Sequence, residues 1–198
     1  MRSVLAVIIA ILAALGVGAS VSHFFHEDFN PGYARFAPVV KAHVVLGAVY
    51  LALAPLQFVA PIRARAINYH RRVGRILATI GAVIGAAAVF MSVVIPIAGW
   101  WERAVVGSFG IFFLFALGKA IYHIRRQEVA QHREWMIRAF AIALAIATMR
   151  VIGTTIVAFT ENRSPEFLRF VFNLTLTIAL LLHAAMAEAW IRSTRTAS

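Results

Sequence analysis

Long apolar stretches repeat along this chain, and each is close to the length that crosses the hydrocarbon core of a bilayer. A transmembrane helix needs about 20 mostly apolar residues, and such stretches lie at 3–21, 36–60, 73–97, 104–122, 139–159 and 167–190. Hydrophobic residues make up 62% of the 198-residue chain, against about 45–50% in soluble domains. The sequence therefore predicts an all-α, polytopic membrane protein whose six transmembrane helices form one bundle and one domain, residues 1–198.

The first stretch, residues 3–21, has two interpretations. It follows a single basic residue, Arg2, and ends in small residues, which is typical of a secretory signal peptide. Its length of about 19 residues exceeds the 7–15 residues of a signal peptide's apolar region, so a retained helix is favoured. A cleaved signal peptide is the alternative and would leave five transmembrane helices.

Basic residues are unevenly divided between the two sides of the predicted bundle. If the stretches alternate in direction, one side carries thirteen of them: Arg2, Arg63, Arg65, Arg71, Arg72, Arg75, Lys119, Arg125, Arg126, Arg133, Arg138, Arg192 and Arg195. The other side carries five, which are Arg35, Lys41, Arg103, Arg163 and Arg169. Because cytoplasmic loops hold the excess of basic residues, we predict a multi-pass protein of the inner (plasma) membrane with both termini in the cytoplasm.

The formal net charge of +11 bears on the partners of the protein. The charge lies in short connections rather than on a soluble face or arm, which argues against a nucleic acid. Anionic lipid headgroups on the cytoplasmic side are the expected partners, at about 1 kcal/mol for each basic side chain. The chain has no cysteine, which excludes disulfides, iron–sulfur clusters and thiolate catalysis. No His-Glu-x-x-His motif of a metalloprotease occurs.

Arg150 lies inside the apolar stretch 139–159, about 18 Å along the helix from its start. A charged side chain at that depth costs about 2.5–3.5 kcal/mol and normally faces protein or a water-filled cavity. The expected partners are backbone, His43, a lipid or ligand anion, or a polar side chain such as Gln57 or Asn173. One hypothesis is therefore a quinone-like ligand whose carbonyl oxygen is bound between these donors, with neutral His43 exchanging a proton.

His70 and His132 lead to a second hypothesis. Each begins an apolar stretch at the predicted cytoplasmic side, with arginine close by. Histidines on two helices at one depth can supply both axial ligands of a b-type haem, while arginines such as Arg71 and Arg138 pair with its propionates. The outer half offers too few histidines for a second haem. A third hypothesis gives the chain no chemistry of its own and makes it an accessory or structural subunit of a larger membrane complex.

The motifs also resemble those of a known family. They are His43 in a stretch that ends with Gln57, then Arg63-x-Arg65, then His70-Arg71-x-x-Gly74-Arg75, and then His132-Arg133-x-Trp135-Met136-x-Arg138 with Arg150 downstream. This pattern, over about residues 36–152, resembles an uncharacterised family of predicted bacterial membrane proteins that is known only as a domain of unknown function. The resemblance implies a shared fold and candidate ligand-binding residues, and it implies no reaction. Ligand identity and oligomeric state are left open.

Overall fold

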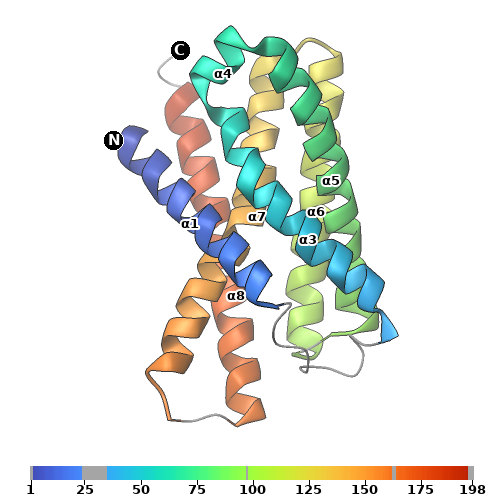
Figure 1. Ribbon diagram of the computed structural model, residues 1–198, viewed down its shortest axis with the longest axis vertical. Coiled ribbons are helices and arrows are strands. Elements are labelled where there is room, and N and C mark those ends of the chain that lie inside the picture. The colour runs from blue at the N-terminus through green and yellow to red at the C-terminus, as the bar shows by residue number, and fades with distance from the viewer. Residues whose placement is uncertain (1, 24–34, 97, 162–163, 196–198) are drawn as a thin grey trace.

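The computed structural model describes residues 2–23, 35–96, 98–161 and 164–195, and every regular element in these ranges is a helix. In chain order they are α1 (Arg2–His23), α3 (Ala37–Leu53), the 3-10 helix η1 (Ala54–Phe58), α4 (Ala60–Arg65), α5 (Ile67–Val94), α6 (Trp100–Arg125), α7 (Val129–Ala158) and α8 (Pro165–Arg195). The helices α1 and α3 are inclined to the long axis of the bundle (Figure 1). The prediction of an all-α polytopic membrane protein is confirmed.

Five helical segments are long and apolar enough to cross a bilayer: α3 continued by η1, α5, α6, α7 and α8. The helix α1 was also predicted to cross the membrane, which would make six transmembrane helices. Within the residues that the structure describes, it contains only the shorter apolar segment Val7–Gly18. Both α5 and α7 begin ahead of the apolar stretches at 73 and 139, because backbone hydrogen bonding continues into polar residues at a helix end. His70 and His132 therefore lie in the first turns of their helices.

The helix α3 is shorter than the apolar stretch 36–60 predicts. It ends at Leu53, and the 3-10 helix η1 follows. Pro55 explains the change, because proline lacks an N–H group and its ring clashes with the carbonyl group one turn earlier. Beyond η1, Arg63 Nη1 donates hydrogen bonds to the carbonyl oxygens of Gln57 (3.4 Å) and Phe58 (2.5 Å). This side chain ties α4 to η1 and satisfies carbonyl groups that the interrupted helix leaves exposed.

Small residues allow α5 and α6 to pack closely. A β-carbon at Gly85 would lie 2.8 Å from side-chain atoms of Phe113 and Leu114 on α6, so only glycine fits without displacing these two side chains. Nearby, Tyr50 of α3 is 1% exposed, and its ring meets Phe113 edge-on with centroids 6.1 Å apart. The core of the protein is therefore shared by α3, α5 and α6 at this level.

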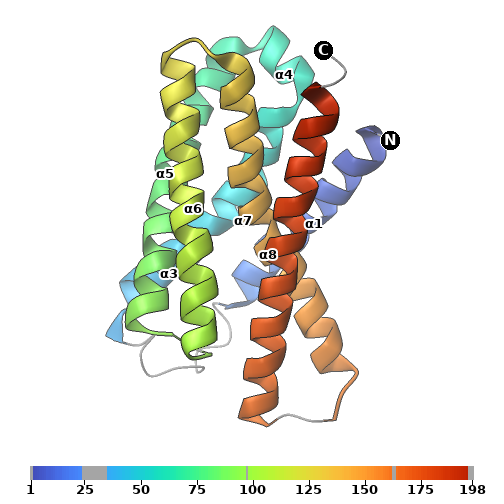
Figure 2. The ribbon, with the colours of Figure 1, turned by 180° about the vertical axis from the view of Figure 1, so that it is seen from behind.

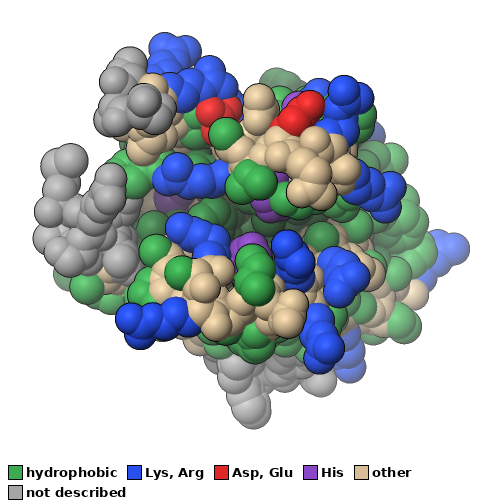
Figure 3. Space-filling model, turned by 90° about the horizontal axis from the view of Figure 1, so that it is seen from above, with side chains coloured by type: hydrophobic (Ala, Val, Ile, Leu, Met, Phe, Trp, Pro, Cys, Tyr) green, Lys and Arg blue, Asp and Glu red, His purple; other side chains and the backbone are tan. Residues whose placement is uncertain are grey.

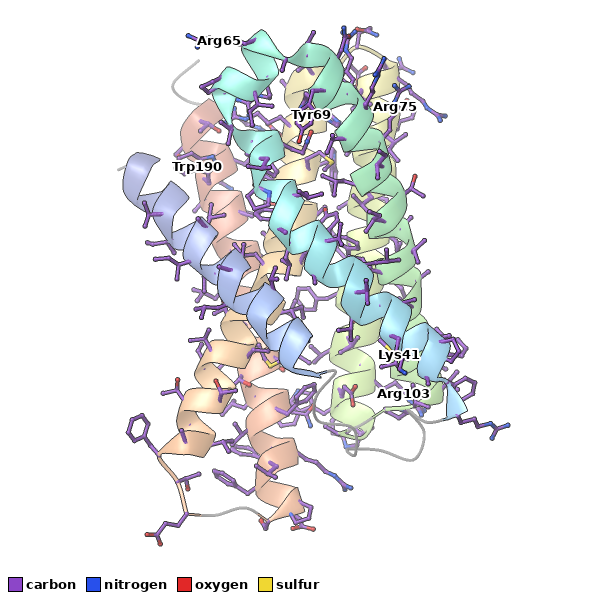
Figure 4. All side chains as sticks on the ribbon, in the orientation of Figure 1. Lys41, Arg65, Tyr69, Arg75, Arg103 and Trp190 are labelled. Carbon is purple, nitrogen blue, oxygen red and sulfur yellow. The ribbon has the colours of Figure 1, made fainter. Side chains whose placement is uncertain are left out.

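One end of the bundle is rich in arginine, and we call it the basic end. It holds α4, the start of α5 and the turn between α6 and α7, with the basic residues Arg63, Arg65, Arg71, Arg72, Arg75, Arg125, Arg126 and Arg133. In Figure 1, α1 begins and α8 ends in the same half of the molecule as α4. Lys41 and Arg103 lie at the opposite end (Figure 4). The grouping of charge agrees with the count from sequence, and which end faces the cytoplasm stays a prediction.

Ion pairs join α7 and α8, which lie side by side (Figure 2). The Nε and Nη2 atoms of Arg138 donate to the two carboxylate oxygens of Glu188 at 2.5 and 3.1 Å. Arg195, near the end of α8, pairs with both carboxylate oxygens of Glu134. Two bidentate pairs therefore hold these helices together toward the basic end.

Candidate ligand site at the basic end

Gln57 places a buried amide at the basic end. Its side chain, on η1, is 8% exposed, and its Oε1 atom lies 3.4 Å from the position that a β-carbon on Gly74 would take. The amide therefore lies against α5 at Gly74. Neither Nε2 nor Oε1 of Gln57 has a hydrogen-bond partner among the described residues. A buried polar group without a partner costs about 1–3 kcal/mol, so this amide is a candidate ligand-binding group.

His132 is held in one orientation by the backbone of α6. Its Nδ1 atom lies 2.9 Å from the carbonyl oxygen of Ala120. Because a carbonyl oxygen only accepts, Nδ1 carries the proton and Nε2 keeps a lone pair. The other side of the ring therefore presents an acceptor or a metal ligand, in the arrangement that metal-binding histidines adopt.

His70 lies near His132 and two arginines. Its ring is within electrostatic reach of Arg63, His132 and Arg71. Its Nδ1 atom is buried and has no hydrogen-bond partner in the described parts of the chain. Gly74, which the Gln57 amide approaches, is one turn beyond His70 on α5, so Gln57 and His70 lie on the same face of that helix. We call Gln57, His70 and His132 the Gln–His site.

The surface of the basic end is hollowed near its middle. Figure 3 shows histidine side chains at the hollow, with Lys and Arg side chains around it. Arg65, Tyr69 and Arg75 lie at the same end of the bundle in Figure 4. A ligand that enters here therefore meets a positive rim before it reaches the imidazole rings.

A metal ion at the Gln–His site would have two histidine ligands from the protein. No group of three or more His, Asp, Glu or Cys residues in the described ranges is arranged to hold an ion. A structural zinc ion takes four ligands, whereas a b-type haem needs only two axial ligands. The residues present therefore fit haem in kind and do not fit zinc.

The two arginines predicted to pair with haem propionates have different surroundings. Arg71 is near His70. Arg138 is paired with Glu188, and its guanidinium lies over the ring of Trp135, 4.5 Å from the centroid. Because Arg138 is engaged by neighbouring side chains, we do not include it in the Gln–His site.

His43 and Arg150 lie close together at a different level of the bundle. The Nδ1 atom of His43 is 3.0 Å from the carbonyl oxygen of Ile84, and its ring is within electrostatic reach of Arg150. Ile84 is ten residues beyond Gly74 on α5, about 15 Å along that helix. Gln57, which contacts Gly74, therefore belongs with His70 rather than with this pair.

Arg150 contacts the backbone of the first helix. Its Nη1 atom donates a hydrogen bond to the carbonyl oxygen of Gly16 at 3.4 Å, so backbone is one of the partners it uses, as predicted. Asn173, also considered as a partner, donates from Nδ2 to the carbonyl oxygen of Ala98 at 3.0 Å. It therefore braces the connection between α5 and α6 and does not bind Arg150.

The remaining histidines of α6 and α8 have polar partners. The Nδ1 atom of His123 lies 2.5 Å from Glu128 Oε2, and Arg126 Nε donates to Glu128 Oε1 at 3.1 Å. The hydrogen bond with His123 is the main reason why the pKa of the Glu128 carboxyl lies below its ordinary value of 4.5. His183 Nε2 lies 2.8 Å from Thr148 Oγ1. Each ring therefore helps to connect chain segments.

Two buried polar groups were not singled out from the sequence. Glu102 is 6% exposed, and its Oε2 atom accepts a hydrogen bond from the Ala98 N–H group at 2.6 Å. The hydroxyl of Tyr50 is buried without a hydrogen-bond partner among the described residues. A signal for Tyr50 was present, because it follows His43 by seven residues and precedes Gln57 by seven. A spacing of seven residues is close to two helical turns.

The comparisons with known proteins agree with this fold. The profile of a family described as predicted membrane protein (DUF2306) matches residues 40–191. The chain belongs to this family. The match begins in α3 and ends in α8, so it includes both groups of polar residues and extends past residue 152. No curated protein and no solved structure matches the chain. The predicted resemblance to an uncharacterised family is confirmed.

Proposed function

We propose that this DUF2306 protein binds one quinone-like ligand at the Gln–His site, between η1, α5 and α7, and serves redox chemistry in the membrane. One observation carries the proposal: Gln57 Nε2, Gln57 Oε1 and His70 Nδ1 are buried without hydrogen-bond partners among the described residues. Buried polar side-chain atoms in folded proteins are nearly always hydrogen-bonded. A ligand with carbonyl or hydroxyl oxygens supplies partners for all three atoms.

The donors and acceptors of the site suit both oxidation states of a quinone. The Gln57 amide N–H group donates to a quinone carbonyl oxygen, and the His132 Nε2 lone pair accepts a hydroxyl proton from the quinol. Arg63 and Arg71 lie near His70. Their positive charges stabilise a deprotonated ligand oxygen.

Aromatic surface lies beside the polar groups. Phe58, the neighbour of Gln57 on η1, packs against Phe140 of α7 with ring centroids 5.3 Å apart. Sites for small ligands typically combine such apolar lining with a few convergent polar groups. A quinone ring therefore has both an apolar face to cover it and polar groups to orient its oxygens.

A single b-type haem is the second candidate, and the hydrogen bond between His132 and Ala120 favours it. That bond leaves Nε2 of His132 available, so that His132 from α7 and His70 from α5 would be the two residues that hold the iron. Arg71, near His70, would pair with a propionate. Quinone and haem would be bound by the same side chains, so the two candidates are distinguished by identifying the bound group.

The cofactors that co-purify with the protein test both the quinone and the haem candidate. Protein from cells grown with ample haem is examined for Soret absorption, and its lipid extract is analysed for quinone. We expect quinone that is lost in Gln57→Leu and His132→Gln and retained in His123→Gln, which alters a histidine outside the site. A Soret band that disappears in His70→Gln and His132→Gln would establish haem instead. Folded protein that lacks both and does not take up an added short-chain quinone would contradict both candidates.

A quinone between His43 and Arg150 was the other predicted position. The Nδ1 atom of His43 and Nη1 of Arg150 are already close to the carbonyl oxygens of Ile84 and Gly16, which makes this position weaker than the Gln–His site. The variant Arg150→Gln separates the two positions. Quinone content that falls in this variant and persists in Gln57→Leu would move the ligand to His43 and Arg150.

For orientation, we propose that the basic end faces the cytoplasm from the inner (plasma) membrane, where it meets anionic headgroups. The chain has no cysteine, so a single introduced cysteine reports its side of the membrane. Ala130 lies in the first turn of α7 at the basic end, and Glu161 follows α7 at the other end. An impermeant maleimide on intact cells should label Glu161→Cys and not Ala130→Cys. The reverse pattern would overturn the orientation.

An accessory role in a larger membrane complex is the remaining alternative. It predicts that the protein co-purifies with a fixed partner in constant ratio. A solitary protein that retains its own quinone or haem would contradict it.

A further inference from the structure

We propose that the lipid-facing side of α6, near the basic end, binds the headgroup of one anionic phospholipid in a groove at Lys119. The groove has a volume of about 340 Å³ and is lined by Phe115, Gly118, Lys119 and Tyr122. These residues lie on α6, which stands at the surface between α5 and α7 in Figure 2. The proposal does not rest on the Gln–His site or on the function assigned to it.

Gly118 leaves the middle of this shallow groove open. A β-carbon built at Gly118 meets no atom of the described structure within 4 Å. Phe115 and Tyr122 are about one turn before and one turn after it, with 53% and 49% of their surface exposed. Ile111, a further turn along the same face, is 61% exposed. The groove therefore opens on an apolar strip of α6 that faces lipid in a bilayer.

Lys119 places a positive charge at a defined position in this groove. Its Nζ atom lies 5.2 Å from the ring centroid of Tyr122 and 5.9 Å from that of Trp135, within the range of cation–π attraction. Trp135 is itself packed edge-on against Phe115 with centroids 5.5 Å apart. Lys119 makes no hydrogen bond or ion pair with any described residue. Its ammonium group is therefore positioned by aromatic rings and not neutralised by an acid.

The nearby polar groups favour an anion as the ligand. Arg126 Nη1 donates to the hydroxyl oxygen of Tyr122 at 3.1 Å, which leaves the hydroxyl proton available for another acceptor. The carboxylate on this side of the turn, Glu128, is paired with Arg126 and His123. The Lys119 ammonium and the Tyr122 hydroxyl are then two donors on one groove, as a phosphate group requires.

The apolar surface next to the Lys119 ammonium and the Tyr122 hydroxyl favours a phospholipid over a soluble anion. Toward the centre of α6 the groove ends at Phe115, and the exposed side chain of Ile111 lies one turn further on the same face. Both offer apolar surface to an acyl chain. Burial of that chain adds to the attraction between phosphate and ammonium. A soluble phosphate would gain the polar contacts alone. The groove therefore fits a molecule with an anionic head and an apolar tail that lies along the helix.

Native mass spectrometry of the purified full chain tests the proposal. The protein is titrated with phosphatidylglycerol, with phosphatidylcholine as the zwitterionic control and inorganic phosphate as the soluble anion. We expect one phosphatidylglycerol to be retained in preference to both, and Lys119→Gln to weaken its binding about five-fold, the effect of one basic side chain near an anionic headgroup. Gly118→Leu should weaken binding at least as much, because the new side chain fills the groove.

A control variant distinguishes binding in the groove from general attraction to the basic end. Arg125→Gln removes an exposed charge of the basic end that does not line the groove, and it should leave the affinity unchanged. Equal weakening in Arg125→Gln would indicate diffuse attraction and overturn the proposal, as would full binding in Gly118→Leu or equal retention of phosphatidylcholine. If Lys119→Gln fails to fold, Gly118→Leu still decides the result, because leucine is a better helix former than glycine.

Discussion

Arg150 Nη1 donates a hydrogen bond of 3.4 Å to the carbonyl oxygen of Gly16, a residue on a helix 134 positions earlier in the chain. Gly16 is buried, and a β-carbon there would lie 2.8 Å from Leu51 and 2.9 Å from Ala147. The helix α1 therefore meets α3 and α7 at a point where only glycine fits. These contacts build α1 into the bundle, and whether residues 3–21 are retained or cleaved stays a prediction.

The close approach at Gly16 predicts a difference between two glycines of one helix. Gly16→Ala should lower the thermal stability of the purified protein, by about 1–3 kcal/mol as for other overpacked sites. Gly18→Ala should be neutral or stabilising, since a β-carbon there meets no described atom within 4 Å and alanine is the better helix former. Equal melting temperatures for the two variants would mean that α1 is not packed as described.

Gln57 predicts a conflict between stability and binding. In ligand-free protein, Gln57→Leu should raise stability by about 1–3 kcal/mol, because it removes two buried polar atoms that lack partners. The same variant should lose the quinone, so added ligand should stabilise the wild-type protein and not the variant. Thermal unfolding in detergent with and without a short-chain quinone measures both effects. A destabilised Gln57→Leu variant would show that the amide serves the fold instead of a ligand.

The ion pair between Arg138 and Glu188 predicts a graded loss of stability. The Arg138 side chain is 14% exposed and that of Glu188 is 41% exposed. Glu188→Gln should therefore cost more than the 0.2–1 kcal/mol or so of an exposed pair and less than the 3–5 kcal/mol or so of a buried one. Glu128→Gln, at the surface turn between α6 and α7, is the matched control and should change the melting temperature less. A larger effect for Glu128→Gln would contradict this ranking.

Glu128 predicts a pH dependence that is confined to the turn between α6 and α7. Its carboxyl pKa is lowered from 4.5 by the hydrogen bonds with His123 and Arg126. A carboxyl whose pKa is lower in the folded state stabilises it above the unfolded pKa, and that contribution disappears as the pH falls through the folded pKa. Hydrogen exchange at Gln127 and Val129, corrected for intrinsic rates, should therefore rise below about pH 4.5. Glu128→Gln should remove this rise.

Much of the fold could be predicted because the length of an apolar run sets what crosses a bilayer. Most of the run at 73–97 lies in α5, which begins six residues earlier, at Ile67, and ends at Val94. The polar residues before the run place His70 in the first turn of the helix. The end of α3 at Leu53 was harder, since proline is tolerated within membrane helices when other groups satisfy the backbone. Here Pro55 lies within η1, and Arg63, beyond η1, donates hydrogen bonds to the carbonyl oxygens of Gln57 and Phe58.

The candidate site was predictable in part. Two histidines at one depth were expected from their places in the chain, and the structure brings His70 and His132 near each other. Gln57 was grouped with Arg150 instead, because a position along one helix does not tell which neighbour the side chain meets. The partner of Arg138, Glu188, is 50 residues away and gave no local signal.

Apolar runs and charged connections were enough to decide that this chain crosses a membrane several times and which polar groups lie near each end. Both features reflect the free energy of transferring each residue from water into the bilayer. This free energy depends on the depth of the residue along its helix and not on which helices lie beside it. The meeting of Gln57 with Gly74, and of Arg150 with Gly16, was decided only by how the helices pack. Membrane helices are apolar on all sides, so their sequence carries little information about which face turns inward, and small residues at points of close approach make that choice.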